Sequence, residues 1–210
     1  MKHIIIFRVF ILGFSLFAHP TFATTIAMSF SGASAAPVTG LPDDITVGWS
    51  FTTKNSKLRV TSVGFYDHAG DHTLADSHRV AIFTAGGDNL GESTISSASN
   101  LVDSFLYEPL ITSIILNANT TYNIGALMPS ANDIVIGKAV ADPDDKIIYG
   151  EARYALNIFS SPDLPFSSNN DGFFGPNFQF ETVASVPAPN VMMLLLSGIG
   201  FIAYRKRAVT

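Results

Sequence analysis

Short segments in which apolar and polar residues alternate constrain the fold of this chain more than any other feature. Between positions 45 and 53, Val47, Trp49 and Phe51 fall on one side of an extended strand, and the residues between them are small or polar. A period of two residues is typical of a β-strand with one buried face. The central part of the chain shows no sustained period of 3.6 residues, so we expect no helix there.

The same rhythm continues along the chain, with residues typical of turns between the apolar runs. The predicted strands are 45–53, 58–66, 78–84, 90–95, 110–116, 121–127, 134–140, 147–158 and 178–183. Residues 24–42 are rich in Ala, Ser, Thr and Pro, and we expect an irregular lead-in there. The pattern predicts an all-β fold, an antiparallel β-sandwich of jelly-roll-like type. Its predicted core includes Val47, Trp49, Phe51, Val63, Phe65, Val80 and Ile82.

Composition excludes several kinds of chemistry. The 210 residues include no Cys, which removes disulfides, thiolate metal sites and Cys nucleophiles. Five of the twelve basic residues lie near the two ends, so the middle of the chain holds seven basic residues against all seventeen acidic ones. This acidic body argues against nucleic-acid binding. It is compatible with cation binding, or simply with solubility.

The N-terminus has the three parts of a secretory signal peptide. Basic Lys2 is followed by a run from 4 to 17 that is apolar apart from Arg8 and Ser15, and Thr21 and Ala23 place small residues at −3 and −1 of a cleavage point. We therefore predict a signal peptide over 1–23, removed by signal peptidase after Ala23. The alternative is an uncleaved N-terminal anchor.

The C-terminus carries a short apolar segment between prolines and basic residues. Its fourteen apolar residues, 191–204, would span only about 21 Å as a helix, and about 27 Å if extended back to Pro187, against a hydrocarbon core of about 30 Å. The basic residues behind it are expected to stay cytoplasmic, which leaves the middle of the chain outside the cytoplasm. The sequence predicts a transmembrane helix here, and the alternative is a buried core helix. The flanking motifs are Pro187, Ala188 and Pro189 before the helix, and Arg205, Lys206 and Arg207 after it.

This tail over 184–210 resembles the PEP-CTERM sorting signal of Gram-negative bacteria, in which a Pro-Glu-Pro tripeptide precedes a short helix and a basic cluster. Ala188 stands here where the family has Glu. The resemblance implies an inner-membrane-anchored precursor and cleavage near the tripeptide by an exosortase-type membrane peptidase. The product would then reach the periplasm, the cell surface or the extracellular matrix.

The segment before the tail, 24–183, is similar to a β-sandwich domain often found in front of PEP-CTERM tails. The resemblance covers roughly 45–182 and implies the fold and the address, with no activity to carry over. The blocks that carry it are Val47-Gly48-Trp49-Ser50-Phe51, Val63-Gly64-Phe65-Tyr66-Asp67, Ser77-His78-Arg79-Val80-Ala81-Ile82, Thr120-Thr121-Tyr122-Asn123-Ile124-Gly125-Ala126 and Gly175-Pro176-Asn177-Phe178-Gln179-Phe180.

The polar loop between 67 and 78 is the densest cluster of metal-ligating residue types. Asp67, Asp71 and Asp76 have oxygens that could wrap a hard cation, and they predict a weak Ca²⁺ site. Three His in the same loop leave Zn²⁺ or Mn²⁺ open, while a solvated loop with Asx turns needs no metal at all. The spacing matches no standard metal motif.

Aromatic side chains are a second kind of candidate, because they can stack on sugar rings. The candidates are Trp49, Tyr66, Tyr107, Tyr122 and the pair Phe173-Phe174. At strand spacing, Trp49 is expected in the core, whereas Phe173-Phe174 falls in a loop rich in Gly and Asn.

The sequence favours a non-enzymatic function. There is no Gly-x-Ser-x-Gly elbow, and Glu residues are too scattered to pick out a glycosidase pair. We expect an exported envelope or matrix protein, a binding or structural module associated with exopolysaccharide. Alternatives are an adhesive module that contacts other proteins, and a metal-dependent hydrolase that uses the Asp67–His78 loop.

Overall fold

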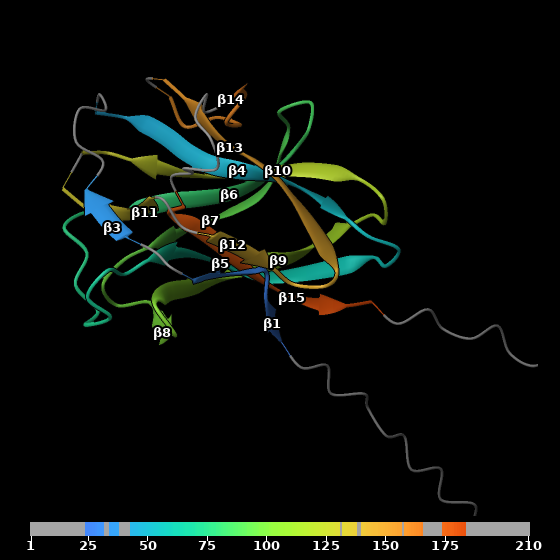
Figure 1. Ribbon diagram of the computed structural model, residues 1–210, viewed down its shortest axis with the longest axis horizontal. Coiled ribbons are helices and arrows are strands. Elements are labelled where there is room, and N and C mark those ends of the chain that lie inside the picture. Colours follow the sequence, from blue (N-terminus) through green and yellow to red (C-terminus); the bar gives the residue numbers. More distant parts are fainter. Residues whose placement is uncertain are drawn as a thin grey trace, which may run out of the picture.

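The computed structural model describes residues 24–31, 34–37, 43–130, 132–137, 140–156, 158–165 and 174–183 (Figure 1). The predicted signal peptide, 1–23, and the predicted sorting tail, 184–210, lie outside these residues. No residue in the described ranges is helical, and none of these ranges holds a helix long and apolar enough to cross a membrane. The described part of the chain is all-β, as the alternating pattern predicts.

The strands of the described residues are short and all pair antiparallel. They are β1 (Thr25–Ile26), β2 (Met28–Ser31), β3 (Ser34–Pro37), β4 (Ile45–Thr53), β5 (Leu58–Tyr66), β6 (His78–Thr84), β7 (Asn89–Ile95), β8 (Asn100–Val102), β9 (Phe105–Leu116), β10 (Thr121–Met128), β11 (Ile134–Gly137), β12 (Val140–Pro143), β13 (Ile147–Ala155), β14 (Leu164–Pro165) and β15 (Pro176–Thr182).

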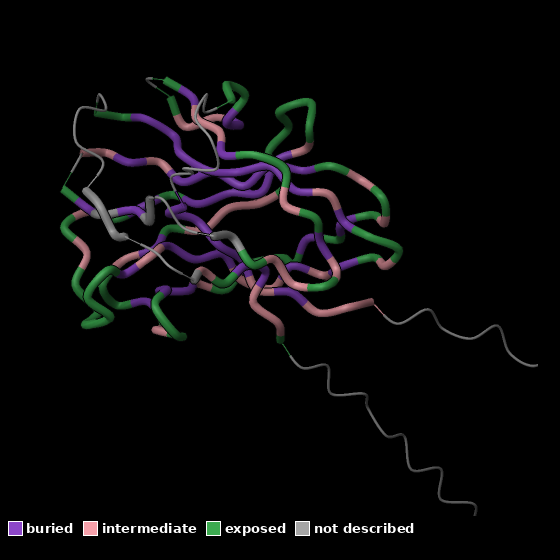
Figure 2. Tube along the Cα trace, in the orientation of Figure 1, coloured by how far each residue is buried: buried purple, intermediate pink, exposed green. Residues whose placement is uncertain are grey.

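Two larger sheets form the sandwich. One has the order β1-β15-β5-β9-β8, and the other has the order β14-β13-β4-β10-β6-β7. Two small two-stranded sheets, β11-β3 and β12-β2, complete the described fold. Figure 1 shows the two large sheets as stacked layers, and Figure 2 shows that their central strands are buried while the connecting loops are exposed.

Aromatic side chains join the two sheets across the core. Trp49 and Phe51 of β4 both contact Phe178 of β15, with ring centroids 5.9 and 4.9 Å apart. The Trp49 indole N–H donates to the backbone oxygen of Pro176 at 2.8 Å, so its polar atom is satisfied inside the core. All seven core residues predicted from the alternating pattern are fully buried, which confirms that part of the prediction.

The second face of β4 differs from the expectation. A half-buried strand was predicted, but the small residues Thr46 and Ser50 on that face are buried too. The hydroxyl of Thr46 donates to the backbone oxygen of Ile158 at 2.7 Å, and the hydroxyl of Ser50 accepts from the amide of Glu151 at 3.0 Å. Backbone groups of later segments therefore cover this face. The sequence pattern does not distinguish a polar side chain that forms hydrogen bonds with the backbone from one that forms them with water.

The segment predicted as an irregular lead-in contains strands instead. β1 pairs with β15, β2 with β12 and β3 with β11. The predicted strand 134–140 is likewise two strands, β11 and β12, each paired with a strand of this N-terminal segment. Composition alone failed here, because short strands of Ala, Ser and Pro are decided by their partner strands rather than by their own propensity.

The two ends of the described domain leave it side by side. Thr25 of β1 pairs with Phe180 of β15, and the two strands run antiparallel. The chain that precedes β1 and the chain that follows β15 therefore start from the same end of the five-stranded sheet (Figure 1).

Candidate functional site

The three aspartates of the predicted calcium loop each have a role inside the protein. Asp67 is 1% exposed, and its carboxylate accepts hydrogen bonds from the amides of Gly70 at 3.1 Å and His72 at 2.8 Å. Asp71 accepts from the amide of Thr73, and Asp76 accepts from the hydroxyl of Ser130. The bonds of Asp67 and Asp71 are local side-chain–backbone bonds of the kind that short polar side chains make in loops, whereas that of Asp76 reaches a residue 54 positions away.

The structure does not bring these carboxylates together as a ligand set. In the described part of the chain, no group of three or more His, Asp or Glu side chains is placed to hold a metal ion. The second histidine of the loop, His72, has a positive φ of 64°, a backbone conformation that its bond to Asp67 helps to hold. Calcium binding by Asp67, Asp71 and Asp76 stays a prediction.

The third histidine, His78, lies in the core instead of the loop. Its ring is fully buried and stacks on Phe65, with centroids 3.8 Å apart. Nδ1 lies 2.9 Å from the backbone oxygen of Leu127, and Nε2 lies 2.9 Å from Oδ2 of Asp133. A carbonyl oxygen only accepts, so Nδ1 carries a hydrogen.

Asp133 completes a buried polar network that the sequence did not reveal. Its two oxygens accept from the amides of Ala75 and Asp76 at 2.8 and 2.9 Å, in addition to the contact with His78. Burial raises the pKa of Asp133, but the hydrogen bonds from His78, Ala75 and Asp76 and the charge of His78 outweigh it, so the pKa is lowered. The side chains of His78 and Asp133 are enclosed in the protein, with relative exposures of 0% and 8%. Their contacts join β6 to the loop before it and to the segment that holds Asp133.

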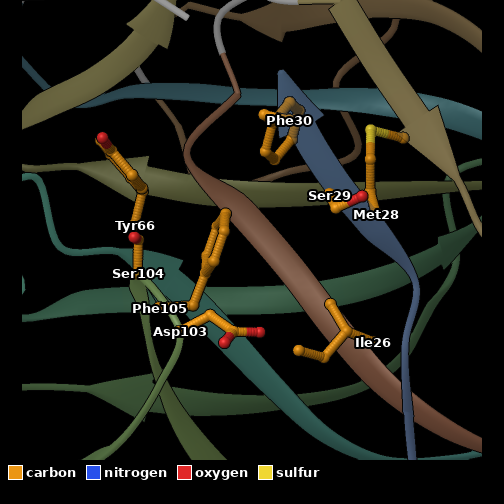
Figure 3. A pocket seen from close by; sticks show the side chains of 8 residues that line it. All are labelled: Ile26, Met28, Ser29, Phe30, Tyr66, Asp103, Ser104 and Phe105. Atoms are coloured by element: carbon orange, nitrogen blue, oxygen red, sulfur yellow. The ribbon is translucent and has the colours of Figure 1, made fainter. Parts of the chain in front are cut away.

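A pocket of about 370 Å³ lies between the N-terminal strand β2 and the end of the five-stranded sheet. Pockets that take small ligands have volumes of about 300–1,000 Å³. The residues that line it are Ile26, Met28, Ser29, Phe30, Tyr66, Asp103, Ser104 and Phe105. In the view of Figure 3, Tyr66 and Phe105 lie on one side of the pocket, and Met28 and Ile26 lie on the other.

Three aromatic rings form the apolar part of this pocket. The Phe105 ring lies 5.9 Å from Phe30 and 5.5 Å from Tyr66, measured between centroids. Phe30 also packs on Phe174, with centroids 4.8 Å apart, so the strand that bears it is fixed against the domain. Tyr66 is half-buried, and burial and then the charge of Asp67 raise the pKa of its hydroxyl. The phenol therefore stays neutral and can donate a hydrogen bond at any ordinary pH.

The polar part of the pocket comes from the turn between β8 and β9. Asp103 is exposed and has a positive φ of 53°, and Ser104 follows it. The backbone oxygen of Ser104 accepts from the amide of Asp67 at 2.9 Å. Asp67 thus connects the predicted metal loop to the pocket, because it holds the loop amides with its carboxylate and the pocket turn with its backbone.

Most aromatic candidates from the sequence are not available to a ligand. Trp49, Tyr107, Tyr122 and Phe174 are buried, which was expected of Trp49, while Phe173 lies outside the described residues. The hydroxyl of Tyr107 has no hydrogen-bond partner among the described residues. Burial, followed by the charge of Asp103, raises its pKa. Of the candidates that the structure describes, only Tyr66 lines the pocket.

Comparison with known proteins adds no assignment. No protein-family model matches the chain, and no curated protein matches its sequence.

Proposed function

We propose that this chain is an exported, non-enzymatic module of the bacterial envelope or matrix that binds exopolysaccharide. The proposed location rests on two features of the sequence. One is a signal peptide before Thr24, and the other is a PEP-CTERM-like tail with Pro187, Ala188 and Pro189 ahead of an apolar segment and a basic cluster. Removal of the signal peptide requires signal peptidase, and removal of the tail requires an exosortase-type membrane peptidase. The tail would hold the precursor in the inner membrane until it is cut.

The position of the pocket supports this function. Leu58 at one end of β5 pairs with Thr182, next to the point where the chain leaves the domain, whereas Tyr66 lies at the other end of the same strand. Eight residues of β-strand cover about 26 Å, at about 3.3 Å per residue. A domain attached through the end near Thr182 would present the Tyr66 side of the pocket away from its attachment, while the pocket reaches back along β15 to Ile26, which pairs with Gln179.

The single observation that carries the binding function is the pairing of aromatic faces with polar atoms in this pocket. A pyranose ring has apolar C–H faces that stack on aromatic rings and a rim of hydroxyl groups that need hydrogen-bond partners. The half-buried ring of Tyr66 offers the first, with the buried ring of Phe105 packed beside it, and Asp103 and the hydroxyls of Ser29 and Ser104 offer the second. The carboxylates of the neighbouring loop are engaged by backbone donors and by Ser130, which favours a binding role over a hydrolytic one.

Binding isotherms of the mature protein against the exopolysaccharide of its own host test this proposal. We expect saturable binding, and we expect Tyr66→Ala to weaken it by about tenfold, because one stacking ring is lost from the pocket. Phe159→Ala is the matched control, since Phe159 is a half-buried aromatic that packs on Phe83 and Arg79 of the other sheet. The absence of saturable binding, or equal losses in the two variants, would contradict the proposal.

A further inference from the structure

Among the residues that the structure describes, the lining of the pocket has charge of one sign. Asp103 is the only charged residue in this described lining, which includes no Lys or Arg. Asp67 lies buried directly after Tyr66, and Asp142 pairs across the strands with Ser29. The ion pairs of Arg59, Arg79 and Arg153 engage other carboxylates, those of Glu181, Glu92 and Glu151.

A carboxylate at the pocket interacts differently with different kinds of sugar. An ionised carboxylate accepts hydrogen bonds from hydroxyl or ammonium groups, and such charge-assisted bonds are stronger than neutral ones. A uronate carboxylate or a sulfate ester in the same place would face Asp103 without a compensating cation in the lining. Like charges brought together at an interface are strongly disfavoured and exclude the wrong partner.

We propose that Asp103 makes the pocket selective for a pyranose ring without an acidic substituent, either a neutral or an amino sugar, and that it rejects uronic acids. This inference rests on the proposed function, because it names the class of sugar unit taken by the same pocket. The aromatic side chains of the pocket bind the face of the pyranose ring, and Asp103 determines which substituents on the sugar are accepted.

Three sugars of the same ring size test the selectivity: glucose, glucosamine and glucuronate. The mature protein is titrated with each, and the NMR signals of the aromatic rings in the pocket are followed. We expect glucose and glucosamine to shift these signals saturably, and glucuronate to bind at least about tenfold more weakly. Asp103→Asn should bring glucuronate within about threefold of glucose, because the repelling charge is gone while the hydrogen-bonding shape remains.

The variant is chosen to keep the fold. Asn tolerates the positive φ of position 103 as well as Asp does. Asp163→Asn is the control: it removes the same unit of charge from an exposed position in the segment that covers the other sheet, and it should leave the preference unchanged.

Two results would overturn the inference. One is glucuronate binding to the unaltered protein as tightly as glucose does, and the other is the absence of any saturable shift of the pocket signals with all three sugars. Either result in a protein that still binds its host exopolysaccharide would remove this inference alone. Loss of exopolysaccharide binding would remove the proposed function with it.

Discussion

Replacing Asp133 by Ala should lower the free energy of unfolding by about 3–5 kcal/mol, because several buried polar groups lose their partner at about 1–3 kcal/mol each. The change leaves the buried imidazole of His78 without its carboxylate, and it leaves the amides of Ala75 and Asp76 without an acceptor. Urea unfolding of the two proteins at neutral pH measures the difference. A loss below about 1 kcal/mol would show that the network does not hold β6 to the loops around it.

The same residue predicts how stability depends on pH. The pKa of Asp133 in the folded protein lies below its ordinary value of 3.8, so its ionised form is favoured by folding. Its contribution is therefore present above about pH 4 and is lost as the pH falls through the lowered folded pKa. We expect the unaltered protein to lose more stability than Asp133→Ala does between about pH 5 and pH 2. Parallel curves for the two proteins would contradict this assignment.

Replacing Phe51 by Ala should cost about 3–5 kcal/mol of unfolding free energy, because a large side chain is removed from a closed core. Phe51 is fully buried and contacts Trp49, Tyr122 and Phe178, with ring centroids 5.3, 5.9 and 4.9 Å away. It therefore joins the two sheets as well as filling the space between them.

Thermal or urea unfolding measures this loss against a matched surface variant. Ile111 on β9 is fully exposed, with a relative exposure of 103%, and Ile111→Ala should change stability by no more than about 0.5 kcal/mol. Similar effects of the two substitutions would mean that the two sheets are not packed through Phe51.

The sequence predicted the strands in which apolar and polar residues alternate. β4, β5 and β6 have the predicted bounds, and the core residues on them are all buried. The N-terminal strands β1 to β3 were not predicted. Each is short, and each pairs with a strand about a hundred residues or more further along the chain. Period and propensity are local properties, and they do not report such distant pairing.

The candidate site was only partly predictable for the same reason. Tyr66 was identified as an aromatic that could stack on a sugar, but its partners Phe30 and Phe105 come from two other parts of the chain. Likewise, His78 was grouped with the histidines of the polar loop although it begins the predicted strand 78–84, and its partner Asp133 is 55 residues away. The fold decides that Asp67 and His78 act as internal supports, and residue type alone does not distinguish a support from a ligand.

Export of the domain is the claim on which every proposed role depends, and the mass of the protein recovered from its native host tests it most directly. We predict a mature form that begins at Thr24 and ends near Pro187, because the signal peptide and the PEP-CTERM-like tail are both removed. Exchange of Arg205, Lys206 and Arg207 for neutral residues should leave the precursor uncleaved or misplaced. A protein that retains Met1, or one at the surface that still carries residues 205–210, would contradict the account.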